Sequence, residues 1–301
     1  MKIAVTTPTG NIGRKLVGIL QDQGGHELVL LARKPERLAE EQKRGAVVVE
    51  GDLYDDKFVQ GATQGVDVLF WLAPPDPGAQ DLRGNFNRLA RIAAAVVREN
   101  RIPRVVHLSS VGAHRSEKVG PVNGLYDAEG ILNATDAHVT HLRAAYFMEN
   151  FLSAVGGIQQ AGAVFLPVPG SVRIPMIATQ DIAVAAAKVI TDDTWQGKRV
   201  LELHGAADLS FDEAARAISE VAGRQVKHVE VTPDQALEAM TGLGMSGGVA
   251  GLLVELYAGL GSGWLATEQP RSAESTTPTT FAQFARDVVA PAIQATPSQG
   301  A

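Results

Sequence analysis

The chain has 301 residues, of which 45% are hydrophobic, and it carries a formal net charge of −6. This length suits one large domain or two unequal ones, and the acidic balance argues against a nucleic-acid partner, which needs clustered Lys and Arg. The absence of cysteine excludes disulfides, thiolate metal sites and a cysteine nucleophile. With no leader and no apolar run that could span a membrane, we expect a cytoplasmic protein without membrane contact.

Short apolar runs alternate with helical patterns through the first 150 residues. The runs are "KIAVT", "ELVLLA", "AVVVEGDL", "VDVLFWLA", "RVVHLSS" and "HVTHLRAA". They are β-branched and continuously apolar, as strands buried on both faces are. Strands alternating with helices predict right-handed crossovers and a parallel sheet covered on both sides. The fold class is therefore α/β, a Rossmann-type doubly wound sheet.

The second half predicts a smaller α+β lobe. A helix is expected to end at Gly162, and capping boxes are expected at Ser210 and Thr232. We assign 1–150 to the nucleotide-binding domain with 178–204 returning to it, 151–177 and 205–290 to the small substrate lobe, and 291–301 to a disordered tail. An irregular connector is expected over 265–280. The site should lie at the carboxyl ends of the strands, between the lobes, and the oligomeric state is open.

The opening "TTPTGNIG" is a strand–turn–helix junction of the kind that binds a pyrophosphate. Backbone N–H groups at the helix start face an anion, and glycines permit its close approach. Gly10 and Gly13 fill two of the three glycine positions, whereas Thr7 and Pro8 stand where versions of the motif place the first. A plain structural corner is the alternative. The predicted cofactor residues here are Thr6, Thr9, Gly10, Asn11, Ile12 and Gly13.

The next two strand ends carry candidates for the adenosine half of a dinucleotide. "LLARKPERL" has no acid for the ribose hydroxyls, and Arg33 with Arg37 suits the 2′-phosphate of NADP. Asp52 and Leu53 could bind the adenine amino group and ring. For Arg33 and Arg37 the alternative is a solvated basic turn, and for Asp52 it is an ordinary turn aspartate. NADPH is the preferred cofactor, and NAD remains possible.

The tips of the fourth and fifth strands would face the nicotinamide. Ala73, Pro74 and Pro75 form a wall without donors, and Ser109 supplies a hydroxyl for catalysis or for the nicotinamide, with turn capping as the alternative. The histidines lack ligand spacing, so no metal site is expected, and no G-x-S-x-G elbow indicates a hydrolase.

Together these residues resemble the NmrA-like family of atypical short-chain dehydrogenases, and its bacterial NAD(P)H quinone reductases in particular. The resemblance covers nearly the whole chain through "TPTGNIG", "LARKPERL", "GDLYD", "HLSS", "THLRAAYFMENFL" and "ATQDIAVAAAKVI". It implies either reduction of quinones or azo compounds with NADPH, or a non-catalytic NAD(P)-binding redox sensor that regulates a protein partner.

This chain differs from the family pattern at the residues that would relay a proton. Ordinary short-chain dehydrogenases use a Tyr-x-x-x-Lys pair, but Tyr126 is followed four residues later by Gly130, and the lysine that several family members place ahead of the glutamate falls at Leu125. Alcohol dehydrogenase and epimerase chemistry is therefore disfavoured, and Tyr126 and Ser109 are candidates only.

Hydride transfer to a quinone does not need a tyrosine–lysine pair to supply a proton, because the reduced anion is a phenolate that water can protonate. The expected acceptor is a small molecule bound by Pro75, Tyr146, Phe147 and Asn150, and Tyr146 and Phe147 would also contact the cofactor. The glycine-rich segment 242–263 is expected to form either a lid or a packed helix.

Overall fold

A seven-stranded parallel sheet forms the centre of the computed structural model, which describes residues 1–295. Its strand order is β10-β6-β5-β4-β1-β2-β3, and every neighbouring pair is parallel. This order confirms the doubly wound fold and places the topological switch between β1 and β4. The strands are β1 Lys2–Thr6, β2 Glu27–Ala32, β3 Val47–Glu50, β4 Val68–Trp71, β5 Arg104–Ser110, β6 His138–Ala144 and β10 Lys198–Leu203.

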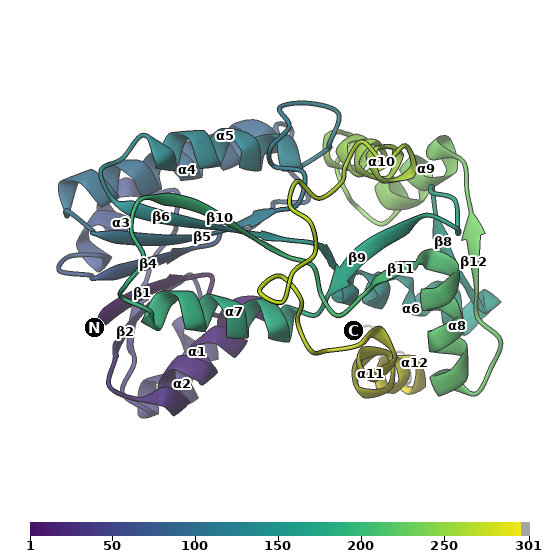
Figure 1. The fold of residues 1–301 in the computed structure, drawn as a ribbon, viewed down its shortest axis with the longest axis horizontal. Helices are drawn as coiled ribbons and strands as arrows, with labels where there is room; N and C mark the ends of the chain where they lie inside the picture. Colours follow the sequence, from purple (N-terminus) through teal and green to yellow (C-terminus); the bar gives the residue numbers. More distant parts are fainter. Residues whose placement is uncertain (296–301) are drawn as a thin grey trace.

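Helices cover both faces of this sheet, as Figure 1 shows. One face carries α1 Asn11–Gln23, a 3₁₀ turn at Pro35–Leu38, α2 Ala39–Lys43 and α7 Thr179–Thr191; the other carries α3 Asp56–Ala62, α4 Leu82–Glu99 and α5 Val122–Asn133. Two clusters of fully buried side chains fill the layers, one around Phe70 and the other around Trp71. Adjacent residues of β4 thus point to opposite faces and anchor both cores.

The second lobe lies beyond the carboxyl ends of the central strands (Figure 1). It contains one three-stranded and one two-stranded sheet. The three-stranded sheet joins β7 Tyr146–Phe147, β9 Arg173–Ile177 and β11 Asp208–Ser210; the two-stranded sheet joins β8 Ala163–Leu166 and β12 Lys227–Glu230. Its helical segments are a 3₁₀ helix Met148–Ala154, α6 Val155–Ala161, α8 Phe211–Ala222, α9 Pro233–Gly242, α10 Gly247–Gly261, α11 Phe281–Phe284, a short π-helix Ala285–Val289 and α12 Ala290–Gln294.

The local end signals of the helices are confirmed. Both capping boxes form, at Ser210 with Glu213 and at Thr232 with Gln235, and Gly162 ends α6 in the left-handed conformation. The segment before Gly162 is a 3₁₀ helix followed by a short α-helix rather than one continuous helix. No described helix is both long and apolar enough to cross a membrane.

The predicted tail at 291–301 needs correction. Helix α12 continues to Gln294; Ile293 packs half-buried against the core, and its carbonyl accepts from the side chain of Gln159 at 2.8 Å. Apolar residues spaced along "FARDVVAPAI" explain this, because they extend the packed face past the point where the prediction ended it. The rest of that predicted tail, 296–301, lies outside the described residues.

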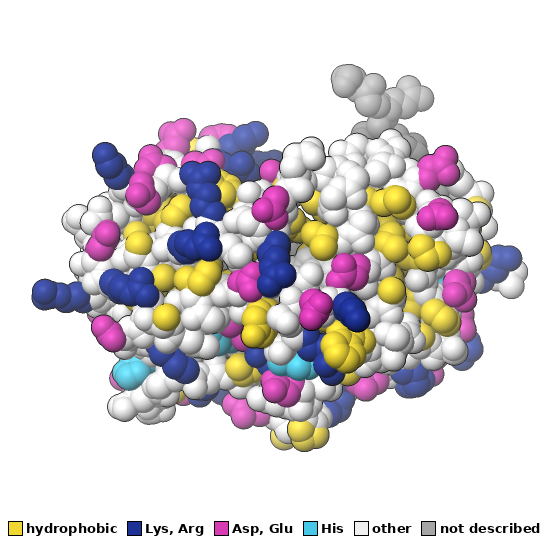
Figure 2. Space-filling model, turned by 90° about the horizontal axis from the view of Figure 1, so that it is seen from above, with side chains coloured by type: hydrophobic (Ala, Val, Ile, Leu, Met, Phe, Trp, Pro, Cys, Tyr) yellow, Lys and Arg dark blue, Asp and Glu magenta, His cyan; other side chains and the backbone are white. Residues whose placement is uncertain are grey.

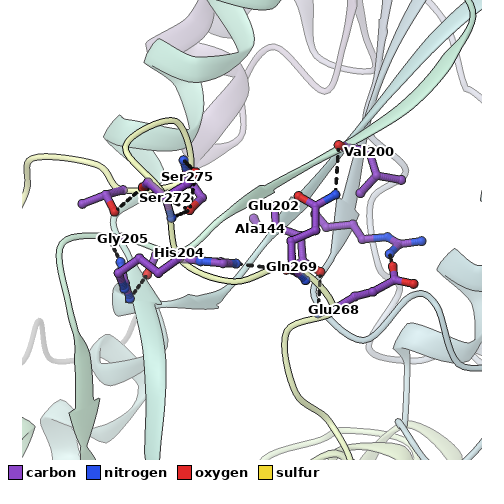
Figure 3. A network of polar contacts seen from close by, with 12 residues as sticks. Ala144, Val200, Glu202, His204, Gly205, Glu268, Gln269, Ser272 and Ser275 are labelled. Carbon is purple, nitrogen blue, oxygen red and sulfur yellow. Dashed lines mark hydrogen bonds and ion pairs between the residues drawn. The ribbon is translucent and has the colours of Figure 1, made fainter.

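The irregular connector at 265–280 forms a strap that runs from α10 back to α11 between the lobes (Figure 1). It is held by polar contacts to β10 and the residues after it, shown in Figure 3. The backbone N–H groups of Glu268 and Gln269 donate to the buried carboxylate of Glu202, each at 3.1 Å, and His204 donates its backbone N–H to Ser275. The strap therefore has a fixed path despite its lack of regular structure.

Candidate functional site

The first turn after β1 has the geometry of a phosphate loop. Gly10 is the N-cap of α1, and its N–H donates to the carbonyl of Thr7 at 3.0 Å. A Cβ on Gly13 would lie 2.2 Å from that same carbonyl oxygen, whereas one on Gly10 would find its nearest neighbour at 3.4 Å. Gly13 thus allows the helix to pack on the loop, and Gly10 leaves the helix start open to a ligand. Thr7 itself has a φ of 50°, a conformation usually taken by glycine.

An open cavity of about 500 Å³ lies in front of this helix start, and its side-chain charges are positive. Arg14 donates to the carbonyl of Arg37 at 3.5 Å, which joins α1 to the loop after β2. Lys15 is held by Thr179 at 2.6 Å and pairs with Glu149 at 3.4 Å. Free N–H groups at a helix start together with cationic side chains suit an anion. The lining residues are Thr9, Gly10, Asn11, Arg14, Lys15 and Arg37.

The residues predicted for the adenosine half lie beyond this cavity. Arg33 and Asp52 are exposed, and Leu53 is buried. Tyr54 marks their neighbourhood: burial raises the pKa of its phenol, and the charges of Asp76 and Asp52 raise it further while those of Arg88 and Arg33 lower it. One oxygen of Asp52 accepts the N–H of Tyr54 at 3.0 Å, which fixes the loop and leaves its other oxygen for a ligand.

Thr6 and the tip of β4 meet at the switch point of the sheet. The N–H of Leu72 donates to the Thr6 hydroxyl at 2.8 Å, and that hydroxyl donates in turn to the carbonyl oxygens of Leu72 and Phe70. Thr6 therefore holds β1 to β4 rather than presenting a free hydroxyl. Ala73 and Pro74 follow, both half-buried, and Pro75 is exposed.

Polar side chains fill the layer between α5 and the β5–β6 pair. Ser109 donates to the carboxylate of Glu129 at 2.5 Å, and Arg143 binds the same carboxylate through two nitrogens, at 2.8 and 3.0 Å. Arg143 reaches the strap through Glu268 at 2.5 Å. Glu129 and Arg143 are each 6% exposed. Glu129 and Arg143 therefore form a buried ion pair in which each charge has its partner, and the hydroxyl of Ser109 is bound to the same carboxylate.

One helical turn along α5 the same layer holds a histidine pair. The Nδ1 atoms of His107 and His141 lie 3.0 Å apart, and Nε2 of His141 lies 3.0 Å from the side-chain oxygen of Asn133. Since the Asn133 oxygen can only accept, His141 carries its proton on Nε2 and accepts from His107. Burial lowers the pKa of both imidazoles to about 3. Both rings are neutral and structural at physiological pH.

The catalytic candidate on α5 lies on the outer surface. Tyr126 is 42% exposed and lines an open cavity of about 860 Å³ with Asn87, Arg91 and Gly130. Among the described residues no hydrogen bond joins its hydroxyl to Ser109. Figure 2 shows this side of the molecule, where charges of both signs mix with scattered apolar side chains.

Tyr146 and Phe147 form β7, one residue beyond the end of β6, and are half-buried, whereas Asn150 is exposed. The ring of Tyr146 makes edge-on contacts with Phe151 and Phe211, at 6.2 and 5.7 Å between centroids. Its hydroxyl lies 3.0 Å from that of Tyr257 on α10. The structure therefore brings Tyr146 together with a residue that the sequence did not single out.

One cluster has the composition of a metal site. The side-chain donor atoms of His114, Glu202 and Glu268 lie within 4.8 Å of one another. Glu202 already accepts from His204 and from two backbone N–H groups, and Glu268 pairs with Arg143. A guanidinium at this point repels a cation. Glu202 and Glu268 therefore belong to a hydrogen-bond network (Figure 3), whereas Nδ1 of His114 is buried without a partner.

Comparison with protein families matches residues 1–261 to the NmrA-like family. The chain belongs to this family. The NAD(P)H azoreductase of Xenophilus azovorans is 28% identical over 256 residues, which cover 85% of this chain and 86% of that protein. Quinone oxidoreductase 2 of Escherichia coli strain K12 is 24% identical over 264 residues, which cover 87% of this chain and 89% of that protein.

Solved structures of two NADPH-binding reductases show the same fold. Quinone oxidoreductase 2 of Escherichia coli complexed with NADPH has a TM-score of 0.80 at 21% identity, covering 94% of this chain and 98% of that one. The triphenylmethane reductase of Citrobacter sp. complexed with NADP(H) has a TM-score of 0.79 at 20% identity, covering 94% and 99%. At these identities the likeness concerns the arrangement of the chain.

The residues of this NmrA-like chain fit a dinucleotide at the α1 end. Gly10, Arg14 and Arg37 line the cavity, and the hydroxyl of Thr7 is buried without a partner. A pyrophosphate would find N–H donors, positive charge and a free hydroxyl together. Arg14 and Lys15 were missed by sequence reasoning, although their place in the first turn of α1, next to the glycines, could have indicated them.

Proposed function

We propose that this protein is an NADPH-dependent oxidoreductase that transfers hydride to a small quinone-like or azo acceptor. The observation that carries the proposal is the cationic cavity at the open start of α1, in a chain of the NmrA-like family. The names of the relatives support it, since they include an NAD(P)H azoreductase and a quinone oxidoreductase.

In this proposal each predicted site residue has a binding role. The N–H groups from Asn11 to Gly13 bind the pyrophosphate, with Arg14 and Lys15 balancing its charge. Arg33 and Arg37 bind the 2′-phosphate, because a forked guanidinium matches phosphate oxygens. Asp52 and Leu53 hold the adenine. The exposure of Arg33 and the place of Arg37 at the cavity edge leave both free to meet a phosphate.

The other end of the site positions two flat rings. Ala73 and Pro74 from the tip of β4 and Tyr146 and Phe147 after β6 surround the nicotinamide, and Pro75 and Asn150 contact the acceptor. When bound, the reduced nicotinamide supplies the hydride. The protein stacks and orients the rings and excludes water, which is sufficient for an acceptor that forms a stable anion. The lysine-free sequence of α5, "VNGLYDAEGILN", fits this undemanding chemistry.

The test is oxidation of NADPH, followed by its absorbance, with a panel of benzoquinones, naphthoquinones and azo dyes. Turnover that saturates with acceptor, and a lower KM for NADPH than for NADH, are the expected results. Tight NADPH binding without turnover of any acceptor, together with a co-purifying protein, would replace the proposal with a non-catalytic redox sensor. Absence of NADPH binding would refute both.

A further inference from the structure

Helix α10 forms a roof over the strand ends where the acceptor is proposed to bind. At its start, Ser246 donates its N–H to the carbonyl of Pro77 at 3.0 Å and its hydroxyl to that of Ala79 at 2.7 Å, both in the loop after β4. Farther along, Glu255 accepts the N–H of Gly120 at 3.2 Å, in the loop after β5. One helix is thus anchored to the loops that follow two adjacent central strands.

The roof lies tightly against these loops. A Cβ on Gly120 would lie 2.1 Å from the carbonyl oxygen of Leu252, and one on Gly259 would lie 3.1 Å from that of Lys118. Beyond the helix, the indole N–H of Trp264 donates to the backbone carbonyl of Glu117 at 3.2 Å. The guanidinium carbon of Arg115 lies over the Trp264 ring, 3.8 Å from its centroid. These contacts fix the height of α10 above the sheet.

Tyr257 lies on the same helix, α10, and its side chain contacts Tyr146 in the segment that follows a third central strand, β6. Its hydroxyl lies 3.0 Å from the hydroxyl of Tyr146, directly beyond β6. The ring of Tyr146 is held by Phe211, which is fully buried, and by Phe151. Both hydroxyls are therefore held in place, at the carboxyl ends of strands where α/β sheets bind ligands.

A pair of hydroxyls has two protons, and only one is used between the oxygens. The second can be donated to a third group. Burial raises the pKa of Tyr146 well above its ordinary value and the neighbouring Tyr257 adds to this, while a hydrogen bond from Asn150 opposes it. Burial also raises the pKa of Tyr257, against the opposing effect of its hydrogen bond with Tyr146. Both phenols remain protonated at neutral pH and are permanent donors.

We propose that Tyr146 and Tyr257 together donate a hydrogen bond to the acceptor oxygen that becomes negatively charged on reduction. This inference rests on the proposed function and assigns a catalytic role within it to both Tyr146 and Tyr257. A quinone that accepts hydride gains one hydrogen and two electrons and becomes a hydroquinone monoanion. The tyrosine pair stabilises its phenolate oxygen, and a proton from water then gives the hydroquinone.

The proposal separates acceptors by their chemistry. A triarylmethane cation takes hydride at its central carbon and becomes neutral, so it forms no anion and needs no proton. Removal of the tyrosine hydroxyls should slow reduction of quinones and spare reduction of such a dye. A packing role of the tyrosines would affect both acceptors alike.

The experiment measures kcat and KM for a naphthoquinone and for a triarylmethane cation in the wild type, Tyr257→Phe and Tyr146→Phe. For the quinone, either variant should lower kcat at least about tenfold with little change in KM. For the dye, kcat should stay within about twofold. Thr241→Val is the matched control, because it removes a hydroxyl that bonds carbonyls of its own helix, α9. Thermal unfolding and NADPH titration verify that each variant folds and binds cofactor.

A series of quinones provides a second readout. The loss in Tyr257→Phe should grow with the basicity of the hydroquinone, since a more basic phenolate gains more from a donor. Equal losses with quinone and dye, or no loss with either, would overturn the inference while the wild-type activity upholds the proposed function. A wild type that reduces neither acceptor would overturn the proposed function and the inference with it, in the wild-type arm alone.

Discussion

Three glycines of α1 and its cap allow packing to be separated from ligand binding. Gly10, Gly13 and Gly18 can each be changed to alanine, and the structure gives each a different consequence. A Cβ on Gly13 would lie 2.2 Å from the Thr7 carbonyl oxygen and 2.9 Å from the Pro8 Cα; one on Gly10 would lie 3.4 Å from the Thr7 oxygen; one on Gly18 would have nothing within 4 Å.

The magnitudes follow from these distances. Gly13→Ala forces backbone apart and should cost about 3 kcal/mol, the upper end for overpacking, which lowers the melting temperature by about 6 °C at about 2 °C per kcal/mol. Gly18→Ala should stabilise the helix by about 1 kcal/mol. Gly10 has the extended N-cap backbone that alanine accepts, so Gly10→Ala should cost less than about 1 kcal/mol.

Binding of NADPH should follow a different order. Gly10→Ala places a methyl group where a phosphate must approach the N–H groups, and should raise the Kd at least about tenfold, or about 1.4 kcal/mol. Gly18→Ala should bind as the wild type does. Thermal unfolding by circular dichroism and fluorescence titration with NADPH measure the two properties. A Gly10→Ala variant that binds normally, or a Gly13→Ala variant as stable as the wild type, would refute the assignment of roles.

Three further predictions concern charged and titratable groups. Arg33→Ala should weaken NADPH at least about tenfold and leave NADH unchanged in the same titration; equal loss for both would mean that the 2′-phosphate lies elsewhere. Glu129→Gln should cost about 3 kcal/mol in urea unfolding, because it leaves the buried Nε and Nη2 groups of Arg143 without their carboxylate. Glu268→Gln, on the exposed side of the same arginine, should cost less than about 1 kcal/mol; similar losses would contradict the buried role. His107 and His141 have folded pKa values of about 3, against 6.5 for the ordinary imidazole. The stability they contribute is therefore complete above pH 6.5 and falls as the pH drops toward 3, with a loss of about 2 kcal/mol for each histidine at pH 5. A double His107→Gln, His141→Gln variant should show a flatter change in unfolding free energy between pH 7 and pH 5.

The central sheet could be predicted because its signals are local and repeated. A strand buried on both faces has to be apolar along its whole length, so "VDVLFW" and "RVVHLSS" identify themselves without a partner. The capping boxes at Ser210 and Thr232 are local in the same way, since their bonds span three residues. The extent of α12 depended instead on packing against distant helices, and the prediction ended the ordered chain too early.

The polar layer under α5 was missed, although its spacing is in the sequence. His107 and Ser109 alternate on β5, and His141 and Arg143 alternate on β6, so all four point to one face of the sheet. Glu129 and Asn133 are four residues apart and share one face of the helix above. Each pattern is visible separately, but only the pairing of β5 with β6 brings the partners together, and that pairing spans more than thirty residues.

Thr7 shows a different limit. Its place in the glycine motif was recognised, but the positive φ belongs to Thr7 itself, and a β-branched residue in that conformation is strained. The conformation of Thr7 is fixed by residues that follow it: the N–H of Gly10 donates to the Thr7 carbonyl, and Gly13 packs closely against that carbonyl. The fold imposes the conformation that the residue alone would avoid, and propensity cannot reveal this.

The place of the donors in the proposed site follows from these contacts. In an ordinary short-chain dehydrogenase α5 provides the tyrosine and lysine, but here its inner face is committed to the ion pair of Glu129 with Arg143 and its tyrosine lies outside, at 42% exposure. Ser109, at the tip of β5, is bound to the same carboxylate. A hydroxyl pair beyond the strand ends comes instead from Tyr146 and from Tyr257 on α10. Chemistry that needs only a hydrogen bond to a developing anion can use donors from that side, which is why we expect quinones to be reduced, and not the simple ketones and aldehydes whose alkoxide needs a proton relay.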